Sequence, residues 1–229
     1  MTGAKKGGKA RGVKEVYDAI AGEWAEYKKG SSRSLRHFIS MLPAGCVALD
    51  AGCGSGRNIP EIAGRARLVY GVDFSKKLLA HAAKLVSEKK LGPKVRLLEG
   101  DVRSLPLASR SVDAVFSMAV LHHLGTAEDR TGAFREIRRV LKKGGLAFVT
   151  VWNKSQPRFR KVRGRDAMVP WTAKDGGKIP RYYHFFSPQE LRALAEKTGL
   201  TARDVFFEKD GKRHAEAGAA NLCAVLEKI

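Results

Sequence analysis

The chain has 229 residues, and its 43 lysines and arginines outnumber its 23 aspartates and glutamates, which gives a formal net charge of +20. This length suits one α/β domain with an appendage, and the charge favours a polyanionic partner, above all nucleic acid, over a merely solvated basic surface. No apolar run approaches the roughly 20 residues that a membrane helix needs, and no apolar segment follows the basic N-terminus as in a secretory signal.

The three cysteines are odd in number, and Cys46 and Cys53 lack the close spacing of a zinc site. We therefore expect free thiols and no bound metal. Free thiols are typical of a reducing compartment, so the expected location is the cytoplasm.

Residues 1–12 carry several lysines and glycines and no acid, which predicts a disordered basic arm, followed by a single domain over residues 13–229. Within residues 13–27, apolar side chains recur at helical spacing and predict an amphipathic helix. A second helix is expected over residues 35–42, and residues 43–45 turn the chain into the first strand.

Residues 47–57 read V-A-L-D-A-G-C-G-S-G-R, a short apolar strand that ends in Asp50 and runs into three alternate glycines. Glycine permits positive φ and lets a ligand lie against the backbone, because no Cβ stands in the way. A helix is expected to begin near Asn58. A strand, a glycine-rich turn and a helix N-terminus together predict a nucleotide-type cradle.

The identity of the ligand follows from two residues of this stretch. The dinucleotide fingerprint G-x-G-x-x-G, counted from Gly52, needs a glycine where Arg57 stands. Asp50 would repel a pyrophosphate but would attract the cationic amine of a methionine moiety. The pattern D-x-G-x-G-x-G resembles motif I of the class I S-adenosylmethionine methyltransferases, so the expected cofactor is S-adenosyl-L-methionine, against another nucleotide or a turn without a ligand.

Acids also follow the next two predicted strands. The strand over residues 68–72 leads to Asp73, which is expected to accept the ribose hydroxyls, although it could simply begin a helix. The strand over residues 95–99 leads to Asp101, which is expected to accept the adenine amino group, with the Val102 N–H facing the ring. The predicted cofactor contacts are Asp50, Gly52, Cys53, Gly54, Gly56, Asn58, Asp73, Phe74, Asp101, Val102, Met118 and Ala119.

The rest of the chain completes an alternation of strands and helices. A fourth strand is expected over residues 111–117 and a fifth over residues 146–152, after a turn at residues 142–145. Strands near residues 202–207 and 219–226 should form an antiparallel hairpin at the edge. The expected fold is α/β, a Rossmann-like class I methyltransferase with a doubly wound, seven-stranded, mostly parallel sheet whose last strand is antiparallel.

Residues 153–183 break this alternation. They contain nine basic and two acidic residues, a net charge of +7, with Phe159, Trp171, Tyr182 and Tyr183 interleaved. Basic residues with aromatic rings suit a flipped or single-stranded nucleotide, because the charges meet phosphate and the rings stack on bases. The alternative is a solvated lid whose aromatic side chains pack on the core.

Several of these segments together resemble the tRNA methyltransferases that esterify the carboxymethyl group of wobble uridine, the family that includes the methyltransferase domain fused to an AlkB-type oxygenase. The resemblance covers residues 13–229. Its most specific segments are V-P-W at residues 169–171 and R-Y-Y-H at residues 181–184. Two departures concern substrate contacts: Lys28 stands where the family has Arg, and Ser32-Arg33 stand where it has W-P. Arginine and lysine are not interchangeable at a bidentate carboxylate site.

The resemblance implies methyl transfer to the carboxylate of 5-carboxymethyluridine, or a related uridine, at the tRNA wobble position. This carboxylate is already ionised, so no general base is required. His122, Arg181 and Lys28 are expected to hold the acceptor group, and Tyr182 or Trp171 to stack on the base. Further substrate contacts are expected from His123, Trp171, Tyr182, Tyr183, Arg158, Arg160 and Lys161. The implied partners are tRNA and a small zinc-binding activator protein at the sheet edge.

Two other functions fit parts of the sequence. A quinone- or sterol-type small-molecule methyltransferase would explain residues 100–124 equally well, and His122 would then only shape its loop. The basic charge of residues 153–183 argues against this reading. A non-catalytic RNA-binding subunit of the same fold has no need of the intact Asp50, Asp73 and glycines.

Overall fold

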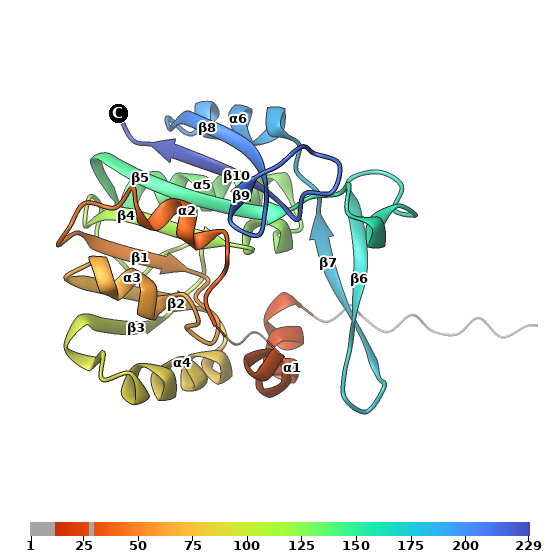
Figure 1. The fold of residues 1–229 in the computed structure, drawn as a ribbon, viewed down its shortest axis with the longest axis horizontal. Helices are drawn as coiled ribbons and strands as arrows, with labels where there is room; N and C mark the ends of the chain where they lie inside the picture. The colour runs from red at the N-terminus through yellow and green to blue at the C-terminus, as the bar shows by residue number, and fades with distance from the viewer. Residues whose placement is uncertain (1–11, 28–29) are drawn as a thin grey trace, which may run out of the picture.

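The structure is a computed structural model that describes residues 12–27 and 30–229, so Lys28 and all but the last residue of the expected basic arm lie outside the described residues. An eight-stranded sheet in the order β3-β2-β1-β4-β5-β10-β8-β9 forms the centre of the molecule (Figure 1). Its strands are β1 (Val47–Ala51), β2 (Leu68–Asp73), β3 (Val95–Glu99), β4 (Val112–Met118), β5 (Leu141–Trp152), β8 (Thr201–Lys209), β9 (Lys212–Arg213) and β10 (Asn221–Glu227).

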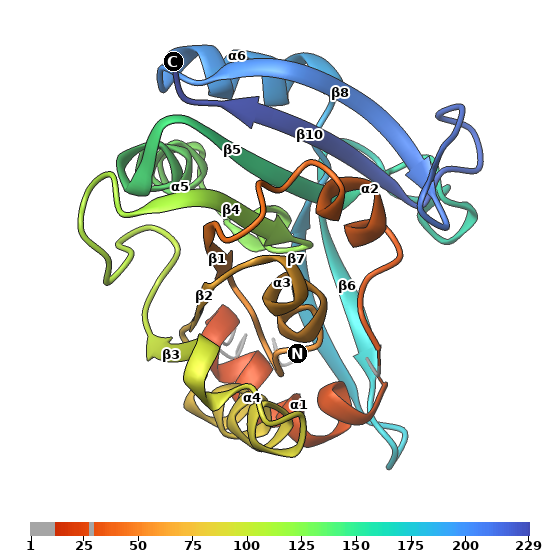
Figure 2. The same ribbon diagram turned by 60° about the vertical axis from the view of Figure 1, so that its left-hand side comes forward.

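Helices cover both faces of this sheet (Figure 2). On one face lie α2 (Leu35–Ile39), α3 (Ile59–Arg65) and α4 (Lys76–Glu88), whose apolar side chains share one buried cluster. On the other face lie α5 (Ala127–Val140) and α6 (Pro188–Lys197), which share a second cluster. The first helix, α1 (Val13–Tyr27), packs beside α4 at the end of the sheet.

Strand pairing confirms the expected doubly wound arrangement. The pairs β1–β2, β2–β3, β1–β4 and β4–β5 are parallel, whereas β10 is antiparallel to both β5 and β8. The last strand, β10, therefore lies between β5 and β8 in the sheet. The two-residue β9 pairs with β8 and adds a short eighth strand at the edge of the seven longer ones. The carboxyl ends of β1, β2 and β4 meet at one edge, where such sheets bind ligands.

The predicted turn at residues 142–145 lies within β5. Leu141 pairs with Val112 and Leu146 with Ala114, so the intervening residues form an irregularity in the strand. Gly144 has φ +75°, a conformation that other residues seldom adopt.

The basic segment of residues 153–183 contains the short 3-10 helix η3 (Pro157–Phe159) and a hairpin of β6 (Asp166–Thr172) and β7 (Lys178–His184). The hairpin is a separate two-stranded sheet that stands beside α1 (Figure 1). Trp171 and Ile179 pack against the cluster that Tyr17 and Ile20 form on α1. The β6–β7 hairpin and α1 therefore face each other next to the ligand-binding edge of the sheet.

A buried histidine fixes the base of this hairpin to α6. His184 lies 2.8 Å from Asp166 through Nδ1 and 2.8 Å from Glu190 through Nε2. The histidine ring thus links a carboxylate of β6 to a carboxylate of α6. Hydrogen bonds from Tyr182 and His184 lower the pKa of Asp166, and although burial raises the pKa of Glu190, hydrogen bonds from His184 and Arg165 lower it overall.

We expect His184→Leu to lower the free energy of unfolding by about 2 kcal/mol, because two carboxylates lose their shared donor. Urea denaturation followed by circular dichroism would measure this loss. His214→Gln at an exposed site provides the control and should change stability by less than about 0.5 kcal/mol. Equal stabilities of the two variants would contradict the anchoring role of His184.

None of the helices in residues 12–27 and 30–229 has the length and apolar character to cross a membrane. The same residues contain no cluster of three or more potential metal ligands.

Candidate active site

A cavity of about 930 Å³ opens at the carboxyl ends of β1, β2 and β4. Its lining includes ten of the twelve residues predicted to contact the cofactor: Gly52, Cys53, Gly54, Asn58, Asp73, Phe74, Asp101, Val102, Met118 and Ala119. The two others lie behind its wall. Asp50 is fully buried, and a Cβ on Gly56 would stand 3.0 Å from Ala82.

The glycines of the β1–α3 loop are required for two different reasons. Gly52 has φ +79°, and a Cβ there would stand 2.5 Å from Cγ2 of Val120. Gly54 has φ +55°, and a Cβ there would meet no described atom within 4 Å, because the residue faces the cavity. The first glycine permits the loop to pack, and the second leaves space for a ligand.

Asp73 is held in place by this loop. Its Oδ2 accepts the Gly54 N–H at 2.8 Å, and its Oδ1 accepts the Ser75 N–H at 2.9 Å. Burial raises the pKa of Asp73, and these backbone hydrogen bonds counteract the shift. Each oxygen keeps a second lone pair, so the carboxylate can still accept ribose hydroxyls as predicted.

Asp50 is the feature that tests whether the cavity fits S-adenosylmethionine. Neither of its carboxylate oxygens has a hydrogen-bond partner among the described residues. Burial raises the pKa of Asp50 to about 7, although the Arg57 cation lowers it. A buried carboxyl without a donor is costly, and the cationic amine of a methionine moiety would supply the missing charge. The acid and the open glycine loop therefore fit the expected cofactor.

This raised pKa predicts a pH dependence. The folded protein holds a proton on Asp50 between the ordinary pKa of 3.8 and about 7, so the free energy of unfolding should fall as pH rises through this window. The ammonium needs the ionised carboxylate, so affinity for S-adenosylhomocysteine should rise about tenfold between pH 6 and pH 8. Calorimetric titration of wild type and Asp50→Asn measures this. An equal rise in the variant would exclude Asp50 as its source.

The predicted adenine contact, Asp101, already has a strong partner. Arg103 donates to it from Nη2 at 2.7 Å and from Nε at 3.0 Å, and it also pairs with Asp129 at 2.7 Å. Burial raises the pKa of Asp101, but hydrogen bonds from Arg103 outweigh this effect and lower it overall. Asp101 lines the cavity next to the buried Val102 and keeps acceptor capacity. Its role toward adenine remains a prediction.

The loop after β4 brings two histidines to the other end of the cavity. Ala119 precedes them with φ +63°, a strained conformation for a residue other than glycine. His122 is buried, and its Nδ1 accepts the Trp152 N–H at 3.2 Å. Its Nε2 must then carry the proton, and this nitrogen has no partner in the part of the chain that the structure describes. Burial and the charges around it keep the pKa of His122 well below 6.5, so it is a neutral donor.

His123 has no such free atom, because both of its nitrogens are bonded within residues 12–27 and 30–229. Its Nδ1–H donates to the Tyr182 carbonyl at 3.0 Å, and its Nε2 accepts from the Tyr17 hydroxyl at 2.8 Å. Burial lowers the pKa of His123 to about 4, which keeps this tautomer neutral. His123 lines the cavity, but its hydrogen bonds join α1, the β4 loop and β7.

Arg181 is the most unusual charge of the site. Only 6% of it is exposed, and its Nε and Nη1 have no hydrogen-bond partner among the described residues. Its guanidinium carbon lies 5.3 Å from the Tyr183 ring centroid, 5.4 Å from those of Trp24 and Trp171, and 5.9 Å from that of Trp152. Aromatic side chains surround this buried cation, and no acid of the described residues forms an ion pair with it. This environment favours an anionic ligand.

The two predicted tyrosine contacts lie on opposite faces of the hairpin. Tyr183 is fully buried and lies between Trp152 and His122, with ring centroids 4.4 Å and 4.8 Å apart. Tyr182 points to the opposite side; its hydroxyl donates to Asp166 and lies 3.1 Å from the Gly125 carbonyl oxygen. Tyr182 and Tyr183 therefore face opposite ways, as adjacent strand residues do, and stacking of the base on Tyr182 stays a prediction.

The basic residues in η3 and directly after it lie in different places. Arg158 lines the cavity, with its guanidinium carbon 4.0 Å from the Trp152 ring centroid. Arg160 and Lys161 are exposed and lie outside the cavities found in the described part of the chain, so they are not contacts of an enclosed acceptor. Lys28, the third residue expected to hold the acceptor group, lies outside the described residues.

Four aromatic residues of the site were not predicted. Tyr17, Trp24 and Tyr27 belong to α1, and Trp152 ends β5; all four line the cavity. The helical spacing in α1 predicted that its aromatic side chains pack in the core, so it did not indicate that they line a ligand cavity. Trp152 had a recognisable signal, because it lies at the carboxyl end of a strand next to the ligand-binding edge.

Comparisons with known proteins agree with this geometry. The family described as "Methyltransferase domain" matches residues 49–149. A protein of Encephalitozoon cuniculi, named as a candidate methyltransferase, is 31% identical over 225 residues, which cover 95% of this chain and 96% of that protein. The tRNA (carboxymethyluridine(34)-5-O)-methyltransferase of Schizosaccharomyces pombe is 29% identical, with 86% of this chain and 92% of that enzyme covered. The Xenopus tropicalis enzyme of the same name is 24% identical, but the match spans only 41% of its length.

Solved structures share the fold. The complex between the Haloferax volcanii Trm112 methyltransferase activator and a methyltransferase contains a match with a TM-score of 0.71 and 20% identity, covering 94% of this chain and 96% of that one. The CcbJ methyltransferase of Streptomyces caelestis matches with a TM-score of 0.75 and 18% identity, over 93% and 96% of the two chains.

Proposed function

The chain belongs to the class I S-adenosylmethionine-dependent methyltransferases, and we propose that it methylates the carboxylate of 5-carboxymethyluridine, or of a related uridine, at the wobble position of tRNA. S-adenosyl-L-methionine, when bound, supplies an electrophilic methyl group on a sulfonium sulfur. The names of the Schizosaccharomyces pombe and Xenopus tropicalis relatives support this acceptor. The observation that carries the proposal is the buried guanidinium of Arg181.

The charge of Arg181 favours a carboxylate over the neutral acceptors of other methyltransferases. A buried cation gains most from an anion that satisfies its free N–H groups, and a guanidinium binds a carboxylate with two parallel hydrogen bonds. Next to it, His122 offers a neutral Nε2–H and Tyr183 a buried hydroxyl, and both lack partners among the described residues. An acceptor carboxylate would satisfy all three.

These residues position the acceptor and exclude water, and they need not remove a proton. The carboxylate is ionised near neutral pH, so its oxygen is already a nucleophile. His122 has a lowered pKa and stays neutral; it can therefore donate a hydrogen bond without neutralising the nucleophile by proton transfer. Loss of the charge on esterification weakens the contact with Arg181 and favours product release.

The surface of the same region suits tRNA. Arg160 and Lys161 are exposed outside the cavities of the described chain, and we assign them to phosphate contacts. If about six phosphates are neutralised, affinity for tRNA should fall on the order of 10³-fold between 50 and 200 mM salt. The likeness to a chain from the Trm112 complex supports a small zinc-binding activator as a second partner, docked at a sheet edge.

Methyl transfer from labelled S-adenosylmethionine to tRNA carrying 5-carboxymethyluridine tests the proposal, with unmodified tRNA as control and with the activator present or absent. Label on the modified tRNA alone is expected. If neither tRNA is labelled in the presence of activator while the cofactor binds normally, the tRNA proposal fails and small carboxylic acids become the acceptors to assay.

A further inference from the structure

A second cavity, of about 540 Å³, lies between α1 and the β6–β7 hairpin. Four residues line both this cavity and the cofactor cavity: Trp24, Tyr27, Trp152 and Arg158. The two spaces therefore adjoin along a shared wall. A ligand in the second cavity can extend one arm toward the first.

The walls of the second cavity are aromatic. All three tryptophans of the chain, Trp24, Trp152 and Trp171, line it. Trp171 meets Trp24 and Tyr27 edge to face, with both centroid distances 5.3 Å, and Tyr27 is 68% exposed at the rim. Such walls bind flat rings by stacking.

The charges of the cavity are distributed unevenly. Glu23 accepts the Trp171 Nε1–H at 3.3 Å and the Lys174 N–H at 3.1 Å, and Glu26 pairs with the Lys174 ammonium at 2.5 Å. Both acids thus have donors at the rim. Arg181 lies deeper, where aromatic rings surround it. The cavity therefore combines flat apolar walls with a cation near the border to the cofactor cavity.

We propose that the second cavity holds the pyrimidine base of the acceptor nucleotide, stacked against Trp171 with Tyr27 at its edge, and with its carboxylate arm directed past Arg181 toward the cofactor cavity. This inference rests on the proposed function, and it adds where the base lies and from which side it enters. The base reaches the pocket between α1 and the hairpin, so it must leave the stack of the anticodon loop. Trp171 determines base affinity, while Arg181 selects the acid.

Tryptophan fluorescence gives a direct test, because every tryptophan of the chain lies in this wall. Titration with 5-carboxymethyluridine monophosphate should give saturable quenching. Uridine monophosphate and the methyl ester of the acid should bind at least about tenfold more weakly, because neither carries the carboxylate. Equal affinities for 5-carboxymethyluridine monophosphate, its methyl ester and uridine monophosphate would overturn the proposal. The absence of saturable binding by the acid would also overturn it.

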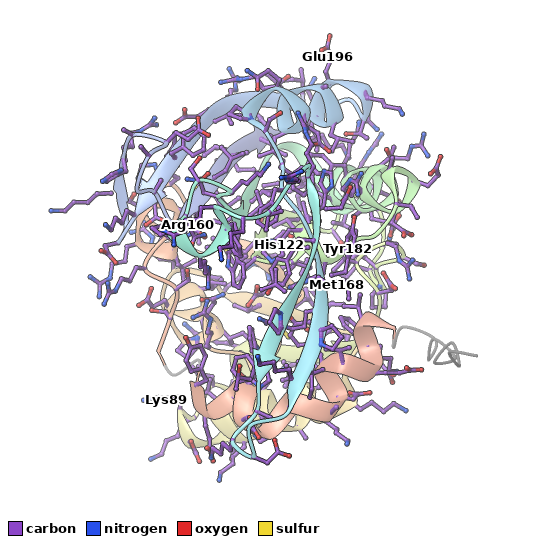
Figure 3. All side chains as sticks on the ribbon, turned by 90° about the vertical axis from the view of Figure 1, so that its right-hand side faces the viewer. Lys89, His122, Arg160, Met168, Tyr182 and Glu196 are labelled. Carbon is purple, nitrogen blue, oxygen red and sulfur yellow. The ribbon has the colours of Figure 1, made fainter. Side chains whose placement is uncertain are left out.

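Variants locate the site, with calorimetry as the readout because they alter the fluorophores. Trp171→Ala should weaken binding of the acid about tenfold or more, and Trp171→Phe less than threefold. Met168→Ala is the matched control: Met168 lies on the opposite face of the same strand and is 52% exposed (Figure 3). Affinity for S-adenosylhomocysteine should stay unchanged in all three variants, which also verifies their folding.

The outcomes separate this inference from the proposed function. If modified tRNA is methylated and Trp171→Ala leaves its KM unchanged, the acceptor is confirmed and the base pocket is wrong. If modified tRNA is not methylated but Trp171→Ala weakens binding of the acid, the base pocket is supported and the proposed tRNA substrate is rejected. Unchanged binding of the acid by Trp171→Ala would reject the pocket in either case.

Discussion

Replacing Arg181 by methionine is expected to lower kcat/KM for the modified tRNA by about 100- to 1,000-fold while affinity for S-adenosylhomocysteine stays within twofold. The magnitude is that of truncating one partner of a buried, hydrogen-bonded charge pair. Stability should respond differently. Because no described residue provides a counterion for Arg181, an apolar side chain of similar length removes a desolvated charge and should change the free energy of unfolding by less than about 1 kcal/mol.

Arg181→Lys serves as the companion variant. It keeps the charge but loses the planar pair of donors, so its activity should lie between those of wild type and Arg181→Met. Steady-state kinetics on tRNA, calorimetry with S-adenosylhomocysteine and urea denaturation provide the three readouts. A variant that lost stability and cofactor affinity in proportion to activity would show that Arg181 only supports the fold.

The cofactor half of the site could be predicted because its residues stand next to strand ends. Short strand patterns predict where the parallel strands stop, and Asp50, Asp73 and Asp101 lie at or just after the carboxyl ends of β1, β2 and β3. All parallel strands have their carboxyl ends at one edge of the sheet, so residues that follow different strands in the sequence lie close together in space. The glycine loop lies between two of these fixed points.

The acceptor half could not be predicted in the same way, because its hairpin gave conflicting signals. A glycine-containing turn such as residues 173–177 is typical of a hairpin, but Pro170 and Pro180 argue against strands, since proline cannot donate to a ladder. The two prolines pair with each other in the register. Without a strand, no face could be assigned, and Tyr182 and Tyr183 remained indistinguishable.

The lack of a counterion for Arg181 in the part of the chain that the structure describes is likewise a property of the fold. Two acids occur in residues 153–183 and could have paired with it. In the structure, Asp166 accepts from His184 at 2.8 Å, and Asp175 accepts the Gly177 N–H at 2.8 Å in the turn. The composition of a segment gives its number of acids. Which cation each acid pairs with depends on burial and on the strand face from which its side chain projects.

The second large effect concerns Gly52. Gly52→Ala should lower the free energy of unfolding by about 2–4 kcal/mol, because the new Cβ would stand 2.5 Å from Val120 and because φ +79° is unfavourable for alanine. Urea denaturation measures the loss. Adding Val120→Ala removes the colliding methyl groups but leaves the backbone strain, so the double variant should recover about half of the loss. No recovery would show that the collision does not cause it.

Gly54→Ala completes this experiment, because it places the same methyl group two residues further along, where it meets no described atom within 4 Å. Its stability cost should be only the roughly 1 kcal/mol of a left-handed alanine. The methyl group would project into the cofactor cavity, so affinity for S-adenosylhomocysteine should fall about tenfold or more. A stable Gly54→Ala with wild-type affinity would mean that the cofactor does not lie against this loop. If Gly54→Ala is stable but binds S-adenosylhomocysteine weakly, Gly54 is required for ligand binding, whereas the instability of Gly52→Ala shows that Gly52 is required for folding of the loop.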